Sequence, residues 1–299
     1  MQEVAKHHRM LDLSNAYGKD EKWLAIDCAF IESGIRYAKA NGCKRIAFGS
    51  LDDTKTANKV RIDILGSLID LEGVMWQIPI PKQADLSALF AHRGLKYLSI
   101  VQPNLAIDLA YFPKLELFDF LFSERISGYE MAKKLRYIKV SKLTANLSFL
   151  GAVKSLVTLN VTRSNIETLS GIENIANLEN LSLTVCTNLT DISHAAGLKK
   201  LKSLHMDRTS KLTDISILGE FDSLVSLWLH SKKIDSCGFI AAMKSLEFAS
   251  LNTEVGDNDL SPVLKSKTLK EIRFSPMKRT YFPKLSLDEI NNMLRQSNN

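Results

Sequence analysis

The sequence contains no apolar run approaching the roughly 18 residues that a membrane-spanning helix needs. Its opening segment, MQEVAKHHRMLDLSNAYGKDEKW, also has no apolar core of signal-peptide length. We therefore expect a protein that is made and kept in the cytoplasm and has no membrane partner.

Paired cysteines are missing too. The chain has no C-x-x-C pair and no zinc-binding spacing, so we expect free, buried thiols. The cysteines are Cys28, Cys43, Cys186 and Cys237. The adjacent His7 and His8 have no second pair of ligands at a useful spacing and are interpreted as surface residues. The sequence predicts no metal and no cofactor.

Catalytic motifs are also absent: the chain contains no GxSxG, P-loop or HExxH sequence. The net charge of +6 is mild for a chain of this size, and a charged content of 24% is typical of a soluble folded protein. We expect no enzymatic activity.

One short motif occurs four times in the middle of the chain. It reads LVTLNV at Leu156, LENLSL at Leu178, LKSLHM at Leu201 and LVSLWL at Leu224. The fourth and sixth positions are two residues apart, so both side chains leave the same face of an extended strand. The segments between copies have mixed three- and four-residue apolar spacing, which favours short helical or irregular returns. One copy cannot bury its own leucines, so the copies are expected to stack into a solenoid.

The same register extends outwards to ten copies with a mean spacing of 22 residues, within the range of about 20–29 for leucine-rich repeats. The first positions are Leu71, Leu95, Leu115, Leu135, Leu156, Leu178, Leu201, Leu224, Leu246 and Leu269. The segments NLTDISHAAGLKKLKSL and KLTDISILGEFDSLVSL resemble the internalin-type branch of the leucine-rich-repeat family. The resemblance implies an α/β solenoid, a horseshoe with a parallel concave sheet of about ten strands, short helical or irregular convex returns and a capping segment at each end.

The sequence departs from the family at one position. The family usually places Asn, Cys or Thr three residues after the sixth position, where the side chain bonds the turning backbone. This chain has Ser164, Cys186, Thr209, Lys232 and Glu254 there. We expect an incomplete ladder of such bonds and irregular turns in the C-terminal repeats.

We interpret residues 1–70 as an N-terminal α/β cap, residues 71–275 as the repeats and residues 276–299 as a C-terminal cap. The first part is expected to contain a helix through Val4–Leu13, the WLAID segment Trp23–Asp27, an amphipathic helix near Ala29–Ala40, a degenerate strand within Arg45–Leu51 and a helical stretch Thr56–Leu71. In the last part, Ser286 and Glu289 predict the capping box of a short helix. An alternative reading treats residues 1–70 as a docking domain.

Strand alternation predicts which side chains a partner would meet. If positions one, four and six face the core, positions three, five and seven face the concave side. Aromatic and charged residues gather at these positions, a composition typical of interface hot spots. The candidate partner-binding residues are Tyr97, Tyr137, Lys139, Arg163, His205, Asp207, Arg208, Trp228, His230, Phe248 and Arg273. The alternative is that Trp228 and Phe248 only cover each other.

We therefore predict a non-catalytic module that binds a folded protein on its concave face, with a cytoplasmic inhibitor or immunity protein as the favoured specific role. The partner would be a toxin or an enzyme. A flat, open face is poor geometry for a small-molecule substrate. We expect Trp228→Ala to leave thermal stability nearly unchanged and to weaken partner binding by about 2 kcal/mol.

Two alternatives remain. One is an adaptor that docks through residues 1–70. The other binds nucleic acid or an acidic surface through basic residues placed two before the first leucine, and its affinity would fall steeply with salt. These basic residues are Arg93, Lys133, Lys154, Lys199, Lys244 and Lys267.

Overall fold

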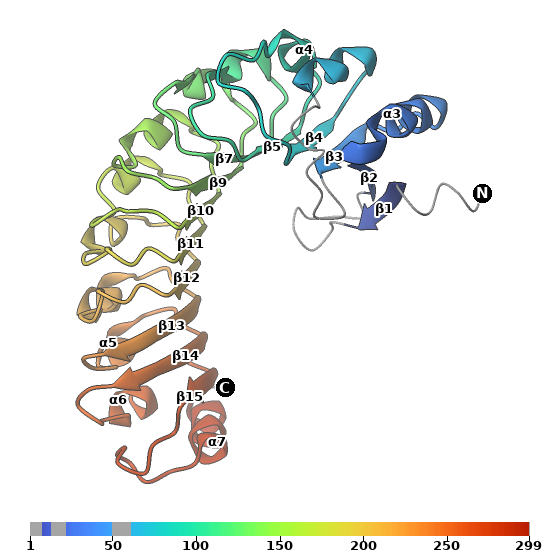
Figure 1. Ribbon diagram of the computed structural model, residues 1–299. Helices are drawn as coiled ribbons and strands as arrows, with labels where there is room; N and C mark the ends of the chain where they lie inside the picture. Colours follow the sequence, from blue (N-terminus) through green and yellow to red (C-terminus); the bar gives the residue numbers. More distant parts are fainter. Residues whose placement is uncertain (1–7, 13–21, 50–60, 299) are drawn as a thin grey trace. The chain divides into compact units, whose positions relative to one another are not determined.

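The computed structural model describes residues 8–12, 22–49 and 61–298. The chain divides into two compact units, residues 1–138 and 139–299. In each unit, the strands lie along one side of the ribbon and the short helices of the returns along the other (Figure 1).

Unit 1 contains a sheet whose strands follow the order β1-β2-β3-β4-β5-β7. The β1 strand is antiparallel to β2, and the other neighbours are parallel. The strands are β1 (His8–Asp12), β2 (Lys22–Asp27), β3 (Arg45–Gly49), β4 (Gly73–Trp76), β5 (Tyr97–Ile100) and β7 (Leu117–Leu121). The other elements of its described residues are α3 (Ile31–Ala40), α4 (Ser87–Phe90), the paired two-residue strands β6 (Ile107–Asp108) and β8 (Ile126–Ser127), and the 3-10 helices η1 (Cys28–Phe30), η3 (Ile62–Ser67), η4 (Leu109–Tyr111) and η5 (Tyr129–Met131).

Unit 2 continues the repeat with parallel strands in the order β10-β11-β12-β13-β14-β15. The β9 strand (Tyr137–Ser141) crosses the boundary between the units. The other strands are β10 (Thr158–Thr162), β11 (Asn180–Thr184), β12 (Ser203–Asp207), β13 (Ser226–Ile234), β14 (Phe248–Val255) and β15 (Glu271–Ser275). The helices are α5 (Phe239–Ala242), α6 (Ser261–Leu264), α7 (Leu287–Ser297), η6 (Ser148–Ala152), η7 (Ile172–Asn174), η8 (Ser193–Ala195) and η9 (Ser216–Glu220).

The repeat motif forms the core as predicted. In one repeat, Leu156, Leu159 and Val161 occupy positions one, four and six, and all three are fully buried. Parallel pairing in exact register places Leu159 beside Leu181 of the next strand. Because neighbouring repeats align in this way, each core leucine packs on its counterpart, and the assignment of positions one, four and six to the core is confirmed.

All ten predicted strands are present, from β4 to β15. The described residues contain two further parallel strands, β2 and β3, so the prediction of about ten strands was too low. Leu24, Ile46 and Val74 lie side by side on β2, β3 and β4, and all are buried. The first two of these strands keep the inward alternation of the repeat without its leading leucine, which is why motif matching did not count them.

One of the predicted helices is wrong, one is confirmed, and one is confirmed in part as a 3-10 helix. The predicted helix Val4–Leu13 contains β1 at His8–Asp12, because these residues pair with the edge of β2. In the predicted helical stretch Thr56–Leu71, the described part forms the 3-10 helix η3 with Ile62, Leu65 and Leu68 buried. A spacing of three suits the 3-10 period better than the α-helical one. The amphipathic helix near Ala29–Ala40 is confirmed as α3.

Several returns begin with the same side-chain turn. The Asp191 carboxylate accepts a hydrogen bond from the backbone N–H of Ser193 at 2.7 Å, and Asp214 accepts one from Ser216 at 2.9 Å. Each donating serine is the first residue of a 3-10 helix, Ser193 in η8 and Ser216 in η9. These hydrogen bonds favour the ionised carboxylates and lower the pKa of Asp191 and of Asp214.

The predicted irregularity of the C-terminal turns is confirmed. In the regular repeats, Ser164 Oγ accepts a hydrogen bond from Leu143 N–H at 3.0 Å and is buried. In later repeats β13 runs on to Ile234, and its register with β14 shifts between His230 and Lys233. The longer strands replace the side-chain ladder with additional backbone pairing.

Helix α7 covers the edge of the last strand. The predicted capping box is confirmed, with Ser286 at the N-cap and Glu289 three residues later. The Asn291 side chain accepts a hydrogen bond from Ile272 N–H at 2.8 Å and donates one to Ile272 C=O at 3.0 Å. One amide therefore satisfies both backbone groups of a residue on the exposed edge of β15, which would otherwise invite another strand.

The cysteines in the described residues are free, as predicted, and all but the partly exposed Cys43 are buried. No helix in the described ranges is long and apolar enough to cross a membrane. Those ranges also bring no three metal-ligating side chains together. The predicted surface role of His7 and His8 lies outside the side chains that the structure describes.

Candidate protein-binding surface

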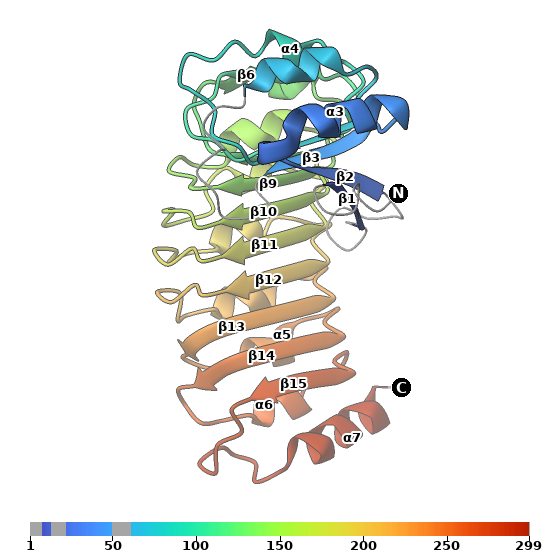
Figure 2. The same cartoon turned by 45° about the vertical axis from the view of Figure 1, so that its right-hand side comes forward.

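The face of the sheet opposite the core, formed by positions three, five and seven, is called the open face below. In unit 2 the register aligns these positions in rows across β12 to β15, strands that lie side by side in Figure 2. Position five contributes His205, Trp228, Ser250 and Arg273. Position three contributes Ser203, Ser226, Phe248 and Glu271, and position seven contributes Asp207, His230, Asn252 and Ser275.

An aromatic pair lies at the centre of these rows. The rings of Trp228 and Phe248 have centroids 5.2 Å apart and are tilted by 47°. The Arg273 guanidinium lies 5.2 Å from the centre of the Phe248 ring, and its Nε is 3.0 Å from a Glu271 carboxylate oxygen. Trp228 nevertheless remains 38% exposed. The two rings do pack on each other, and the contact leaves a substantial part of the indole accessible.

A polar group borders the aromatic pair. The Asp207 carboxylate has one oxygen 2.9 Å from His230 Nδ1 and the other 3.3 Å from Arg208 Nε. The Asp207 side chain is only 16% exposed, whereas those of His230 and Arg208 are more than half exposed. Asp207 thus lies between the two outer side chains and accepts a hydrogen bond from Arg208. His205, in register with Trp228, extends the exposed surface towards β12.

The structure brings together seven of the predicted partner-binding residues, and we call them the aromatic cluster. They are His205, Asp207, Arg208, Trp228, His230, Phe248 and Arg273. Lys139 on β9 and Arg163 after β10 also belong to unit 2 but lie on strands at least two removed from β12. They do not join the cluster.

The two predicted tyrosines lie in a different setting. Tyr137 starts β9 at the end of unit 1, and Tyr97 on β5 is half-buried. The Tyr97 ring meets Trp23 edge-on at 6.2 Å, and the Arg45 guanidinium lies 5.7 Å from the Tyr97 ring centre. Tyr97 therefore packs within unit 1 and keeps part of its side chain exposed, and its role in partner binding stays a prediction.

Unit 1 also contradicts the expectation that position five is exposed. Ser99 and Asp119 occupy that position and are 6% and 4% exposed. Ser99 Oγ donates a hydrogen bond to Asp119 at 3.1 Å. Strand alternation correctly placed Ser99 and Asp119 on the open face, but it could not predict that their side chains are buried there.

Sequence reasoning missed two contributors. Glu271 holds Arg273 over the Phe248 ring, and it could have been found from its position three in the last repeat. Trp23 fills the space above Gly73, where an added Cβ would lie 2.6 Å from the indole. Extending the register to β2 would have aligned Trp23 with Gly73 and Tyr97.

Cys237 shows no feature of a nucleophile. Its thiol is buried in a return and donates to Asp259 C=O at 3.0 Å. Burial, with the nearby charges of Asp257 and Asp259, raises the pKa of Cys237 to about 12. The thiol is therefore protonated at neutral pH and far from reactive.

The register, the buried positions and the returns together settle the architecture. The fold is a leucine-rich-repeat solenoid. No protein-family model and no curated protein matches the sequence. Similar solved structures include an internalin of Listeria monocytogenes, with 16% identity over 81% of this chain and 77% of the other and a TM-score of 0.49. Internalin C2 of the same organism has 20% identity over 61% of this chain and 82% of the other, with a TM-score of 0.46. The leucine-rich-repeat domain of a type III effector has 16% identity over 56% and 62%, with a TM-score of 0.40.

Proposed function

We propose that this leucine-rich-repeat protein is a non-catalytic recognition module whose aromatic cluster binds a folded protein partner. The observation that carries the proposal is the exposure of Trp228, which remains 38% exposed at the centre of the aromatic cluster. Tryptophan and arginine are the residues most enriched among interface hot spots.

The arrangement of charge favours an interface with little salt dependence. Arg273 is paired with Glu271, and Arg208 and His230 are paired with Asp207. Each arginine therefore has its counter-charge within the same face, and a partner would gain mainly from covering the aromatic rings. Contacts of this kind respond weakly to ionic strength, in contrast to unpaired surface charges.

Within this class, the favoured role is a cytoplasmic inhibitor or immunity-type protein that sequesters a toxin or an enzyme. The support is the internal order of the surface. Phe248 is held between Trp228 and Arg273, and the side chains around Asp207 are positioned before any partner arrives. A preorganised surface loses little conformational freedom on binding, as tight inhibition requires.

The test is affinity capture from lysate of the source cell with wild type and a Trp228→Ala/His230→Ala variant, at about 0.15 and 0.5 M salt. A matched control is Phe282→Ala, which removes another exposed aromatic from the segment between β15 and α7. One protein retained at both salts by wild type and the control, and lost by the variant, is the expected result. Its inhibition is then assayed with the purified pair.

Binding that survives the double substitution would place the interface elsewhere. Retention of nucleic acid or of many acidic proteins, lost at high salt from all three baits, would move the function to the basic residues that precede the strands.

A further inference from the structure

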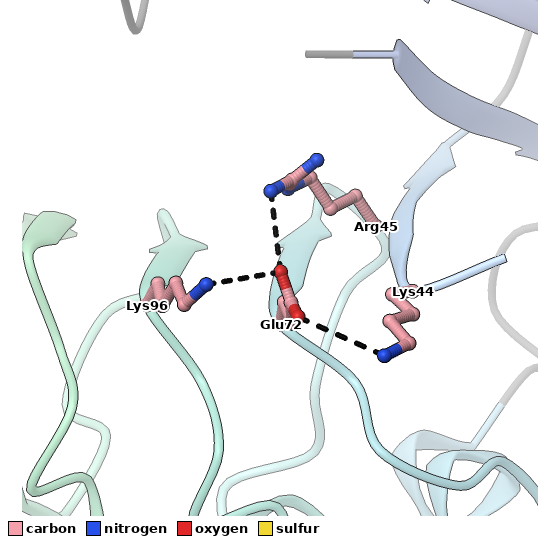
Figure 3. A network of polar contacts seen from close by, with 4 residues as sticks. All are labelled: Lys44, Arg45, Glu72 and Lys96. Atoms are coloured by element: carbon pink, nitrogen blue, oxygen red, sulfur yellow. Dashed lines mark hydrogen bonds and ion pairs between the residues drawn. The ribbon is translucent and has the colours of Figure 1, made fainter.

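A single carboxylate in unit 1 is surrounded by three cations. Glu72 precedes β4, Lys96 precedes β5, Arg45 is the first residue of β3, and Lys44 lies just before that strand (Figure 3). Both Arg45 Nη2 and Lys96 Nζ lie 3.2 Å from one Glu72 oxygen, and Lys44 Nζ lies 3.9 Å from the other. Partial burial raises the pKa of Glu72, but the hydrogen bond from Lys96 and the charges of Lys96, Arg45 and Lys44 outweigh it and lower that pKa overall.

Next to this group lies a hollow of about 440 Å³. Lys44, Glu72 and Lys96 form part of its lining, together with Arg93 and Lys114. Arg93 and Lys114 are exposed and form no ion pair with any described residue. Four cationic side chains thus line one hollow, whose carboxylates are Glu72 and Asp70. Arg45 is a fifth cation, which contacts Glu72 and is not part of the lining.

At the equivalent edge of unit 2, the number of cations around each carboxylate is different. There each carboxylate has one lysine partner, as in Glu179 with Lys202 at 3.1 Å and Glu247 with Lys270 at 3.1 Å. These are the same repeat positions as Glu72 and Lys96. The hollow in unit 1 therefore contains more cations than the one-to-one pairing at these repeat positions requires. Two of them, Arg93 and Lys114, are available to a ligand.

We propose that this hollow is a second binding site, which takes the side-chain carboxylates of an acidic protein segment. It lies in unit 1 and is separate from the aromatic cluster. Glu72 shows that a carboxylate is accommodated among these cations, and Arg93 offers a planar fork that matches a second one. Glu72 also keeps Lys96 and Arg45 oriented, so the site is partly formed in advance.

A carboxylate segment fits better than a nucleic acid. A phosphate backbone carries regularly spaced charges and needs a continuous run of cations. Along this edge, Glu72 and Glu116 interrupt such a run at alternate repeats. An acidic segment can place one or two carboxylates in the hollow and avoid the intervening glutamates.

The probe is a fluorescent hexaglutamate peptide, titrated with the full chain at low salt and followed by anisotropy. Arg93→Ala/Lys114→Ala is expected to weaken binding by about fivefold to tenfold, the effect of losing two exposed ion pairs. The matched control, Lys154→Ala/Lys267→Ala, removes the same charge from exposed positions of unit 2 that correspond to Arg93 in the repeat. It should change the affinity less than twofold.

A third variant tests the carboxylate itself. Glu72→Gln releases three cations and should tighten peptide binding at least twofold, whereas a purely structural role for Glu72 gives no gain. Trp228→Ala should leave peptide binding unchanged, which separates this site from the proposed interface.

Three results would overturn the proposal: equal losses from the two double variants, which indicate general attraction to a basic protein; no measurable binding of the peptide; or tighter binding of a single-stranded oligonucleotide of equal charge. Each variant is checked for a normal melting curve before titration.

Discussion

The substitution Trp228→Ala separates the stability of the fold from its recognition surface. The indole is 38% exposed and covers Phe248 on the open face, so its removal leaves no internal cavity. The loss is therefore limited to the covered part of the side chain, on the order of 100 Å² for a tryptophan that is 38% exposed. At about 25 cal/mol per Å² this gives a loss of roughly 2–3 kcal/mol in the free energy of unfolding. From the sequence we expected almost no change, and the ring contact accounts for the difference.

Binding should respond more strongly. A partner that covers the exposed part of the indole would lose about 2 kcal/mol when Trp228 is truncated, a roughly 30-fold increase in Kd. Trp23 and Trp76 are buried, so Trp228 is the tryptophan that an aqueous quencher reaches. Iodide should quench part of the tryptophan fluorescence of the wild type. This quenchable part should be absent from Trp228→Ala, and a bound partner should protect it from iodide.

The decisive comparison is between the melting temperature and Kd of wild type and variant. A fall in melting temperature of a few degrees with a large loss of affinity supports the reasoning. A collapse of stability with intact affinity would show that Trp228 belongs to the fold and not to an interface.

Three further predictions follow from the core, the last strand and the returns. Leu159→Ala should lower the free energy of unfolding by about 2–5 kcal/mol in urea titration, because Leu159 is fully buried between neighbouring repeats. Asn291→Ala should lower the free energy of unfolding by about 1–3 kcal/mol and increase self-association in sedimentation, because it leaves the backbone groups of Ile272 on the edge of β15 without their partner. Asn292 is exposed, and the control Asn292→Ala should change neither stability nor self-association. The lowered pKa values of Asp191 and Asp214 mean that their contribution to stability is complete above the ordinary carboxyl pKa and is lost as pH falls through the folded-state values. Urea midpoints should thus drop between pH 5 and pH 3, and less so in an Asp191→Asn/Asp214→Asn variant.

The sequence by itself determined the repeat, its register and the alternation of each strand. Leu156, Leu159 and Val161 are recognisable as core because every repeat must bury the same positions against the next, and this constraint repeats along the chain. The same alternation predicted that Trp228 and Phe248 share one face, and the capping box at Ser286 depended only on residues three apart. Features that depend on neighbouring residues or on a repeating pattern can therefore be predicted from the sequence.

The tertiary structure alone decided what occupies the faces and edges. Pairing with β2 made His8–Asp12 a strand against its helical pattern, and Trp23 covered Tyr97 although the two are far apart in sequence. The convergence of Lys44, Arg45 and Lys96 on Glu72 likewise joins three repeats. These contacts depend on side-chain reach between strands and on which surfaces remain uncovered, and neither quantity is encoded in a repeating pattern.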